Sequence, residues 1–77
     1  MGQRIQYQEF YILVDDKSQK DVVYIGRCVV GSDRDTSRGI WQIQKWTETA
    51  NGSFNLWADS DLKFDNVWDD RLTLTYS

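Results

Sequence analysis

The stretch VVYIGRCVV, Val22 to Val30, decides the fold class of this chain. One face of the strand that it predicts carries Val22, Tyr24, Cys28 and Val30, and the other face carries Val23, Ile25 and Val29. Apolar side chains on both faces predict a strand that is central to the fold, or one that a partner covers. Gly26 interrupts the pattern, and a glycine inside a strand often marks a bulge or a close approach to the backbone.

Two further strand signals lie on either side of this stretch. FYILVDD, Phe10 to Asp16, is rich in aromatic and branched residues, which favour a pleated surface. IWQIQKWTE, Ile40 to Glu48, alternates, with Trp41 and Ile43 on one face and Trp46 on the other. Both segments therefore predict strands.

Turn signals separate the predicted strands. The polar stretch GSDRDTSRG, residues 31–39, predicts a loop. The Asn51-Gly52 pair predicts a tight hairpin, after which FNLWA returns as the partner strand. At the C-terminus, LTLTYS alternates and predicts a last strand with Leu72, Leu74 and Tyr76 facing inward.

The stretch KFDNVWDDR, residues 63–71, does not alternate. Phe64, Val67 and Trp68 have the i, i+3, i+4 spacing of one helical turn, which predicts a turn that begins near Asp65. Arg71 would close this turn, paired with Asp70 or reaching back to Asp65 or Asp69. We therefore expect a structural corner that packs the last strand, formed by Phe64, Asp65, Trp68 and Arg71.

These signals predict one all-β domain over residues 1–77. The expected architecture is a small antiparallel β-sandwich or open barrel of about five or six strands, with one short helical turn near residues 64–71. A chain of this length buries roughly 60% of the surface that its unfolded form exposes, so its own core leaves a thin margin of stability. Cys28 is the only cysteine, which excludes an internal disulfide, and the eleven aromatic residues must supply the core or a subunit contact.

The charge balance argues against several classes of partner. Twelve acidic and nine basic residues give a net charge of -3, and phosphate binding requires a basic face, so we expect no nucleic-acid partner. No apolar run approaches the roughly 20 residues of a membrane span. The opening residues MGQRIQYQEF lack the apolar stretch of a signal peptide. We expect synthesis in the cytoplasm and no membrane partner.

Candidate metal and catalytic residues are few. The acids that could offer oxygens to Ca²⁺ are Asp59, Asp61, Asp65, Asp69 and Asp70. Lys63 occupies a ligand position of the calcium-loop pattern and Phe64 replaces its glycine, so capping and solvated charge explain these acids better. A carboxylate pair for glycoside hydrolysis is a weaker alternative. The chain has no histidine to activate Cys28, and we expect no metal, no cofactor and no catalytic residue.

The tryptophans leave two alternatives open. Coplanar exposed rings would form a sugar-stacking surface, as in carbohydrate-binding modules, whereas tryptophan is also enriched at contacts between proteins. Because Trp41 and Trp46 lie on opposite faces of one predicted strand, at least one of them belongs to the core. Core or subunit interface is the better explanation, and our candidate interface residues are Tyr11, Trp46 and Trp57.

Four segments within residues 24–77 resemble, in the same order, a family of short proteins encoded by tailed bacteriophages. They are YIGRCVVGS (24–32), WQIQK (41–45), FNLWADSDLKFDNVWDDR (54–71) and LTLTYS (72–77). The family pattern has Tyr-Ile-Gly-Lys-Ala, Trp-x-Ile, an Ala-Asp-Gly turn, and Phe-Asp-Asn-Val-Trp-Asp-Asp/Asn-Arg before a Leu-Thr-Tyr strand. Residues 64–71 are the most specific part of the likeness. This chain has Cys28 where the family pattern has a small residue, and Ser60 where the pattern has the turn glycine.

Most proteins of this family have no assigned activity, so the resemblance supplies a setting more than a mechanism. That setting implies a virion structural component. On that basis we expect a non-enzymatic structural or assembly protein of the virion. It would bind in multiple copies to the head or tail through an aromatic sheet face. Its expected partners are capsid or tail proteins and further copies of itself in a homo-oligomer. The alternative is a carbohydrate-binding module that takes part in host-surface recognition.

Overall fold

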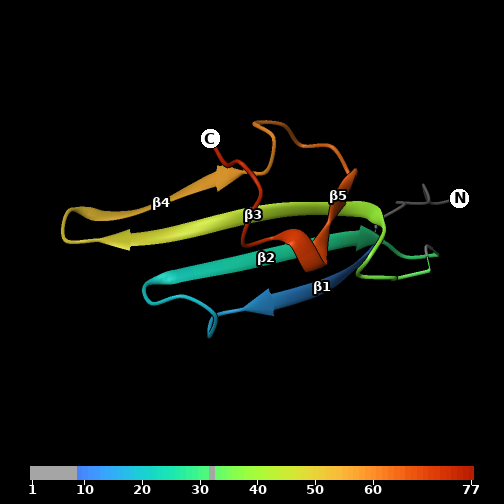
Figure 1. The fold of residues 1–77 in the computed structure, drawn as a ribbon, viewed down its shortest axis with the longest axis horizontal. Coiled ribbons are helices and arrows are strands. Elements are labelled where there is room, and N and C mark those ends of the chain that lie inside the picture. Colours follow the sequence, from blue (N-terminus) through green and yellow to red (C-terminus); the bar gives the residue numbers. More distant parts are fainter. Residues whose placement is uncertain (1–8, 32) are drawn as a thin grey trace, which may run out of the picture.

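The computed structural model describes residues 9–31 and 33–77. Residues 1–8, from which the sequence predicts no signal peptide, lie outside this range. Four strands follow one another in the sheet in the order β1-β2-β3-β4, each antiparallel to the next (Figure 1). They are β1 (Phe10–Asp15), β2 (Val22–Val29), β3 (Gly39–Thr49) and β4 (Gly52–Trp57). The short strand β5 (Asn66–Val67) pairs antiparallel with the beginning of β3, and the 3-10 turn η1 (Trp68–Asp70) follows it.

The predicted fold class is confirmed in its main features. The described chain is all-β and antiparallel, with five strands and one short helical turn within residues 64–71. The sheet is open, with β1 and β4 at its edges. In place of a second sheet, residues 68–77 cross in front of β2 and β3 (Figure 1). They cover one face of the sheet, which we call the covered face.

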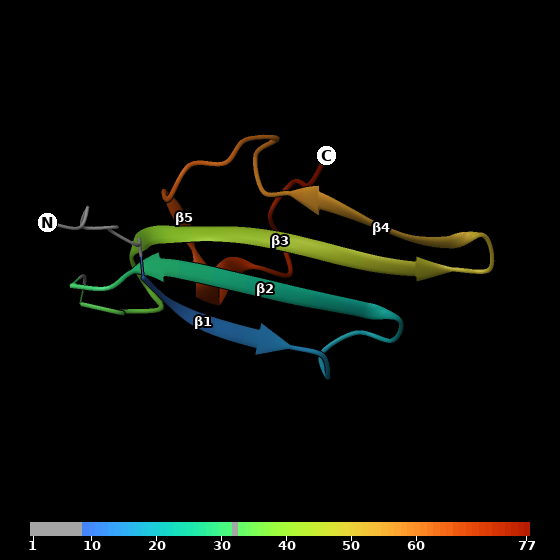
Figure 2. The ribbon, with the colours of Figure 1, turned by 180° about the vertical axis from the view of Figure 1, so that it is seen from behind.

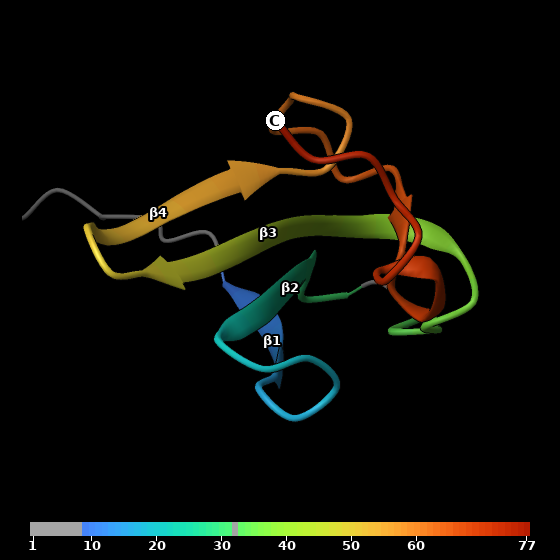
Figure 3. The ribbon, with the colours of Figure 1, turned by 60° about the vertical axis from the view of Figure 1, so that its left-hand side comes forward.

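Strand alternation places the core on the covered face. In β2, every second residue is buried while the residues between them are half-buried, as expected from the sequence pattern. The buried core consists of Val22, Tyr24, Cys28, Trp41, Ile43, Ala58 and Trp68. The rings of Trp41 and Trp68 meet at a centroid distance of 6.1 Å, so η1 and β3 share one aromatic cluster. Figure 3 shows η1 beside the beginning of β3 and the C-terminus beside the end of β4, both far from the turn of the β3–β4 hairpin.

Gly26 lets the Trp68 side chain reach the sheet. A Cβ atom at position 26 would lie 2.5 Å from Cε3 and 2.7 Å from Cζ3 of Trp68. The strand register runs through Gly26 without a shift, opposite Leu13 in β1 and Ile43 in β3. Of the two readings of this glycine, the close approach is therefore correct and the bulge is not.

The helical turn begins later than the sequence spacing predicts. Asn66 and Val67 are extended and pair with Trp41 and Gly39 of β3, so η1 starts only at Trp68. Pairing with β3 satisfies the backbone N–H and C=O groups that a helical turn from Asp65 would have used. Phe64, Val67 and Trp68 therefore do not form one face of a helix, and their side chains have different surroundings.

The prediction of a regular last strand over residues 72–77 is wrong. Within residues 72–77 only Tyr76 forms a bridge, with Ala58, and Thr73 donates its N–H to the Asp70 carbonyl in a turn at 2.9 Å. Leu72 is 53% exposed and does not face inward, whereas Leu74 and Tyr76 pack against the core. A turn directly after η1 reorients the chain before any ladder can form.

The β3–β4 hairpin agrees with its sequence signal. Thr49 pairs with Gly52 across the two-residue connection, and Gly52 has a φ of 125°, a conformation that residues other than glycine rarely adopt. Beyond this hairpin, the N–H groups of Trp57 and Ser77 donate to each other's carbonyl oxygens, which closes the end of the β4 edge. No helix of the described residues is both long and apolar enough to cross a membrane.

We predict that Gly26→Ala destabilises the fold by about 1–3 kcal/mol, the usual cost of forcing a methyl group into a packed core. Chemical denaturation followed by tryptophan fluorescence measures the loss. The same change made in a Trp68→Phe background should cost less, because a phenyl ring lacks the atoms that the new methyl group would meet. An equal cost in both backgrounds would contradict the contact between Gly26 and Trp68.

Candidate functional site

The second face of the sheet is apolar and has little cover, and we call it the open face. Figure 2 shows the four long strands from this side, with no described segment crossing them over most of their length. Strand register sets which side chains project here, because residues opposite one another share a face. The apolar side chains of the open face are Phe10, Ile12, Val14, Val23, Ile25, Val29, Trp46 and Trp57.

The loop between β4 and β5 covers one end of this second face. The Gln42 side chain donates from Nε2 to the Leu62 carbonyl at 2.8 Å. The Phe64 ring stacks on Phe10 at 5.7 Å with an interplanar angle of 5°. Arg27 lies over the same Phe10 ring at 5.7 Å. The chain therefore covers the beginning of β1 and β3 by itself and leaves the other end of the face accessible.

The accessible part of the open face is unusually apolar for a surface. Ile12 and Val14 are 60% and 61% exposed, and Trp46 is 38% exposed. Beside them is a hollow of about 420 Å³. Val23, Ile25 and Trp46 supply its apolar lining. Its polar lining includes Asp16, Asp21 and Glu48.

The three predicted interface residues do not all lie together. Trp46 and Trp57 share a face on neighbouring strands, since Trp46 opposes Asn55 and Trp57 is two residues further along β4. Trp57 is half-buried. Tyr11 lies on the covered face, where it opposes Cys28 and packs against the core with Arg34 over its ring at 4.6 Å. The structure thus brings together two of the three residues.

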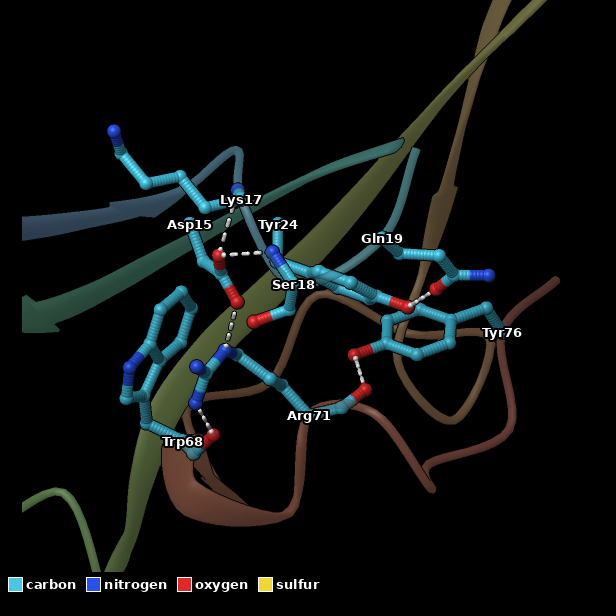
Figure 4. A network of polar contacts seen from close by, with 8 residues as sticks. All are labelled: Asp15, Lys17, Ser18, Gln19, Tyr24, Trp68, Arg71 and Tyr76. Carbon is cyan, nitrogen blue, oxygen red and sulfur yellow. Dashed lines mark hydrogen bonds and ion pairs between the residues drawn. The ribbon is translucent and has the colours of Figure 1, made fainter. Parts of the chain in front are cut away.

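The predicted structural corner exists in part, with a different ion pair (Figure 4). Arg71 donates from Nε to Oδ2 of Asp15 at 2.8 Å and from Nη1 to the Trp68 carbonyl at 3.2 Å. Its guanidinium also lies 4.6 Å from the centre of the Trp68 ring. The expected partners Asp65, Asp69 and Asp70 form no ion pair with Arg71. Phe64 packs on Phe10 and belongs to the other face, so the corner consists of Trp68 and Arg71 with Asp15.

The Asp15 carboxylate is strongly stabilised in its charged form. Oδ1 accepts the backbone N–H groups of Lys17 and Ser18 at 3.0 and 3.1 Å, while Oδ2 accepts from Arg71. Hydrogen bonding from Ser18 and Lys17 and the Arg71 guanidinium together hold the pKa of Asp15 far below its ordinary value. The side chains of Arg71 and Asp15 are only 21% and 10% exposed, so solvent screens this pair weakly.

Two tyrosines complete the corner. The Tyr76 hydroxyl donates to the Arg71 carbonyl at 2.7 Å, and the Tyr24 hydroxyl donates to Oε1 of Gln19 at 2.7 Å. Their rings are 5.8 Å apart. Burial raises the pKa of both phenols, with the neighbouring Tyr24 adding to the shift at Tyr76. Both hydroxyls therefore act as neutral donors in local bonds, Tyr24 to the β1–β2 turn and Tyr76 within the C-terminal segment, while the contact between the two rings joins that segment to the sheet.

The acidic residues of the described chain serve in turns and are not gathered around a metal site. No group of three or more carboxylates, histidines or thiols among them is placed to hold a metal ion. Asp61 and Asp35 instead accept backbone N–H groups two residues further on, as turn-capping side chains do. Cys28 is fully buried, and burial raises the pKa of its thiol.

Asp15 is the residue that sequence reasoning missed. A local signal was present, because an aspartate that starts a polar turn commonly bonds to the backbone two or three residues on. Its ion pair with Arg71 joins positions 56 apart in the chain, and no local pattern predicts it.

No family model matches this chain, and no curated protein or solved structure matches it significantly.

We predict that the free energy of unfolding falls as the pH drops below about 4, with Asp15 as a main contributor. The pKa of Asp15 is lower in the folded state than its ordinary 3.8, so its stabilisation is complete above that value. It is lost as the pH falls toward the folded-state pKa. Asp15→Asn should lower stability at pH 7 and flatten the acid dependence, as measured by urea denaturation at pH 7, 5 and 3.

Asp33→Asn is the matched control, because the Arg38–Asp33 pair has side chains that are 61% and 46% exposed. Exposed pairs contribute little to stability, so this variant should follow the wild-type pH profile. If Asp15→Asn and Asp33→Asn behaved alike, the Asp15–Arg71 pair would not hold the C-terminal segment.

Proposed function

We propose that this chain is a non-enzymatic protein-binding module, a structural or assembly component of a bacteriophage virion. It binds in multiple copies to the head or tail through the open face of its sheet. The observation that carries the proposal is the open face itself, where Ile12 and Val14 of β1 and Trp46 of β3 are substantially exposed, with Val23 and Ile25 of β2 between them. Adjacent exposed apolar side chains on a soluble surface mark sites of association.

The energetics favour a covered state for this face. Full burial of a valine or isoleucine side chain contributes roughly 1.5–3 kcal/mol. Ile12 and Val14 are each about three-fifths exposed, so covering them would contribute roughly 1–2 kcal/mol apiece. Trp46, an aromatic side chain of the kind that dominates contacts between proteins, lies on the same face. A chain that leaves a thin margin of stability gains from such a cover.

The virion setting follows from the sequence resemblance over residues 24–77. In a repeated shell or tube, many copies of a small module bind to a repeated surface, and each copy needs only one binding face. The open sheet supplies one such face per copy, and its partner would be a capsid or tail protein or a further copy of the chain.

A carbohydrate-binding module is the second candidate, and one observation favours it. Trp46 and Trp57 lie on the same face of neighbouring strands, diagonally across β3 and β4. Side chains at such positions are within reach of one another and could stack on successive sugar rings. Because Trp57 is half-buried, we rank this function second. Quenching of tryptophan fluorescence by host polysaccharide would favour it.

We expect the wild-type chain to be present in several copies in purified phage particles. The double variant Ile12→Thr and Val14→Thr should reduce its incorporation at least about tenfold, because it removes the apolar contact area while it keeps branched strand residues. Quantitative mass spectrometry of particles assembled with each variant measures the copy number. Both positions are exposed, so the fold should tolerate the changes, and thermal unfolding of the purified variant checks this.

Leu72→Thr is the matched control, since Leu72 is similarly exposed but belongs to the C-terminal segment rather than the open face. This variant should be incorporated like the wild type. If the wild-type chain were absent from particles, or if the double variant were incorporated as well as Leu72→Thr, the proposal would be wrong.

A further inference from the structure

The hollow on the open face combines an apolar lining with an acidic one. Val23, Ile25 and Trp46 provide apolar surface, and the acidic side chains are Asp16, Asp21 and Glu48. No lysine or arginine of the described chain lines it. The hollow therefore has negative charge on one side and apolar surface on the other.

The acids at this hollow have no cationic partner within the described chain. The ion pairs there join Arg38 to Asp33 and Arg71 to Asp15, and neither includes an acid of the hollow. Asp21 and Glu48 are also neighbours, because the Glu48 N–H donates to the Asp21 carbonyl at 2.9 Å. Like charges on neighbouring residues repel, and a positive group placed near both would relieve this repulsion.

We propose that the hollow receives a lysine or arginine side chain of the partner protein, carried on an extended apolar segment. This inference rests on the proposed protein-binding function and specifies the chemistry of the partner. The methylene stem of such a side chain would lie along Val23 and Ile25, as long cationic side chains commonly do on apolar surface. Its charged end would reach the carboxylates, and the face of the Trp46 ring offers a further attraction for a cation.

Charge complementarity decides between this occupant and others. A purely apolar segment would leave the carboxylates of Asp21 and Glu48 without a counter-charge, beside a surface from which water is displaced. An acidic segment would add to that repulsion. A basic and apolar segment satisfies both parts of the hollow, and complementary charge would also select it against other partners.

Three matched peptides test the inference on the intact chain. They are acetyl-Val-Lys-Val-Lys-Val-amide and the versions in which both lysines are replaced by glutamine or by glutamate. Titration followed by two-dimensional amide NMR measures the affinity and locates the site. The lysine peptide should shift the amide signals of Val23 and Trp46 and bind about tenfold more tightly than the glutamine peptide, with the preference decreasing at high salt.

Charge-removing variants identify the acids responsible. Asp21→Asn with Glu48→Gln should abolish the preference for the lysine peptide. Asparagine suits position 21, where φ is 59°, because it tolerates this left-handed conformation. The control pair, Asp69→Asn with Asp70→Asn, removes the same charge at exposed residues of η1 and should leave the preference unchanged.

Each outcome decides the inference separately from the proposed function. Equal binding of the lysine and glutamine peptides at the open face would overturn the inference and leave a protein-binding face in place. If the control pair also lost the preference for the lysine peptide, or if the shifted amide signals lay in other parts of the chain, the attraction would be general and not specific to the hollow. Either result would overturn the inference. No shift with the lysine peptide at millimolar concentration would also overturn it, while particle incorporation tests the proposed function independently.

Discussion

The contact between the Trp68 indole and the bare backbone of Gly26 is the constraint on which the fold depends. A four-stranded sheet cannot bury its own face, and this chain has no second sheet within the described residues to do so. Trp68 fills that role because Gly26 lets the ring lie directly on β2, against Trp41 of β3. The pairing of Asn66 with β3 fixes where the ring enters. Any side chain at position 26 would push away the segment that closes the core.

Arg71 holds this cover in place where regular backbone pairing is absent. The last residues of a β protein are usually tied down by a strand ladder, but here Tyr76 forms only an isolated bridge. Side-chain bonds compensate, because the Arg71 guanidinium binds Asp15 and lies over Trp68 while its carbonyl accepts the Tyr76 hydroxyl. One residue thus ties the edge strand, the aromatic core and the C-terminal segment together, in a place that solvent screens weakly.

The sequence predicted the features of the fold that strand alternation determines. It missed the features that long-range contacts determine. The two faces of β2 and the opposite placement of Trp41 and Trp46 followed from a period of two, whereas only the structure decided between a bulge and a close approach at Gly26. The start of the helical turn did not, because pairing with β3 extends Asn66 and competes with a helix that local spacing favours. Arg71 had several acids nearby in sequence, yet its partner lies 56 positions away, and only the fold brings the two together. The register that places Tyr11 opposite Cys28, on the covered face, is likewise a property of the sheet pairing and not of the local sequence.

The open face is a consequence of how the chain covers its other side. Trp68 holds the C-terminal segment on the covered face. The loop before β5 contacts the open face near Gln42 and Phe10. Within the described residues, Ile12, Val14 and Trp46 therefore stay exposed on the rest of that face. Each apolar face of a sheet needs a cover, and the described residues provide one for the covered face. For the open face, association with a partner is what we propose.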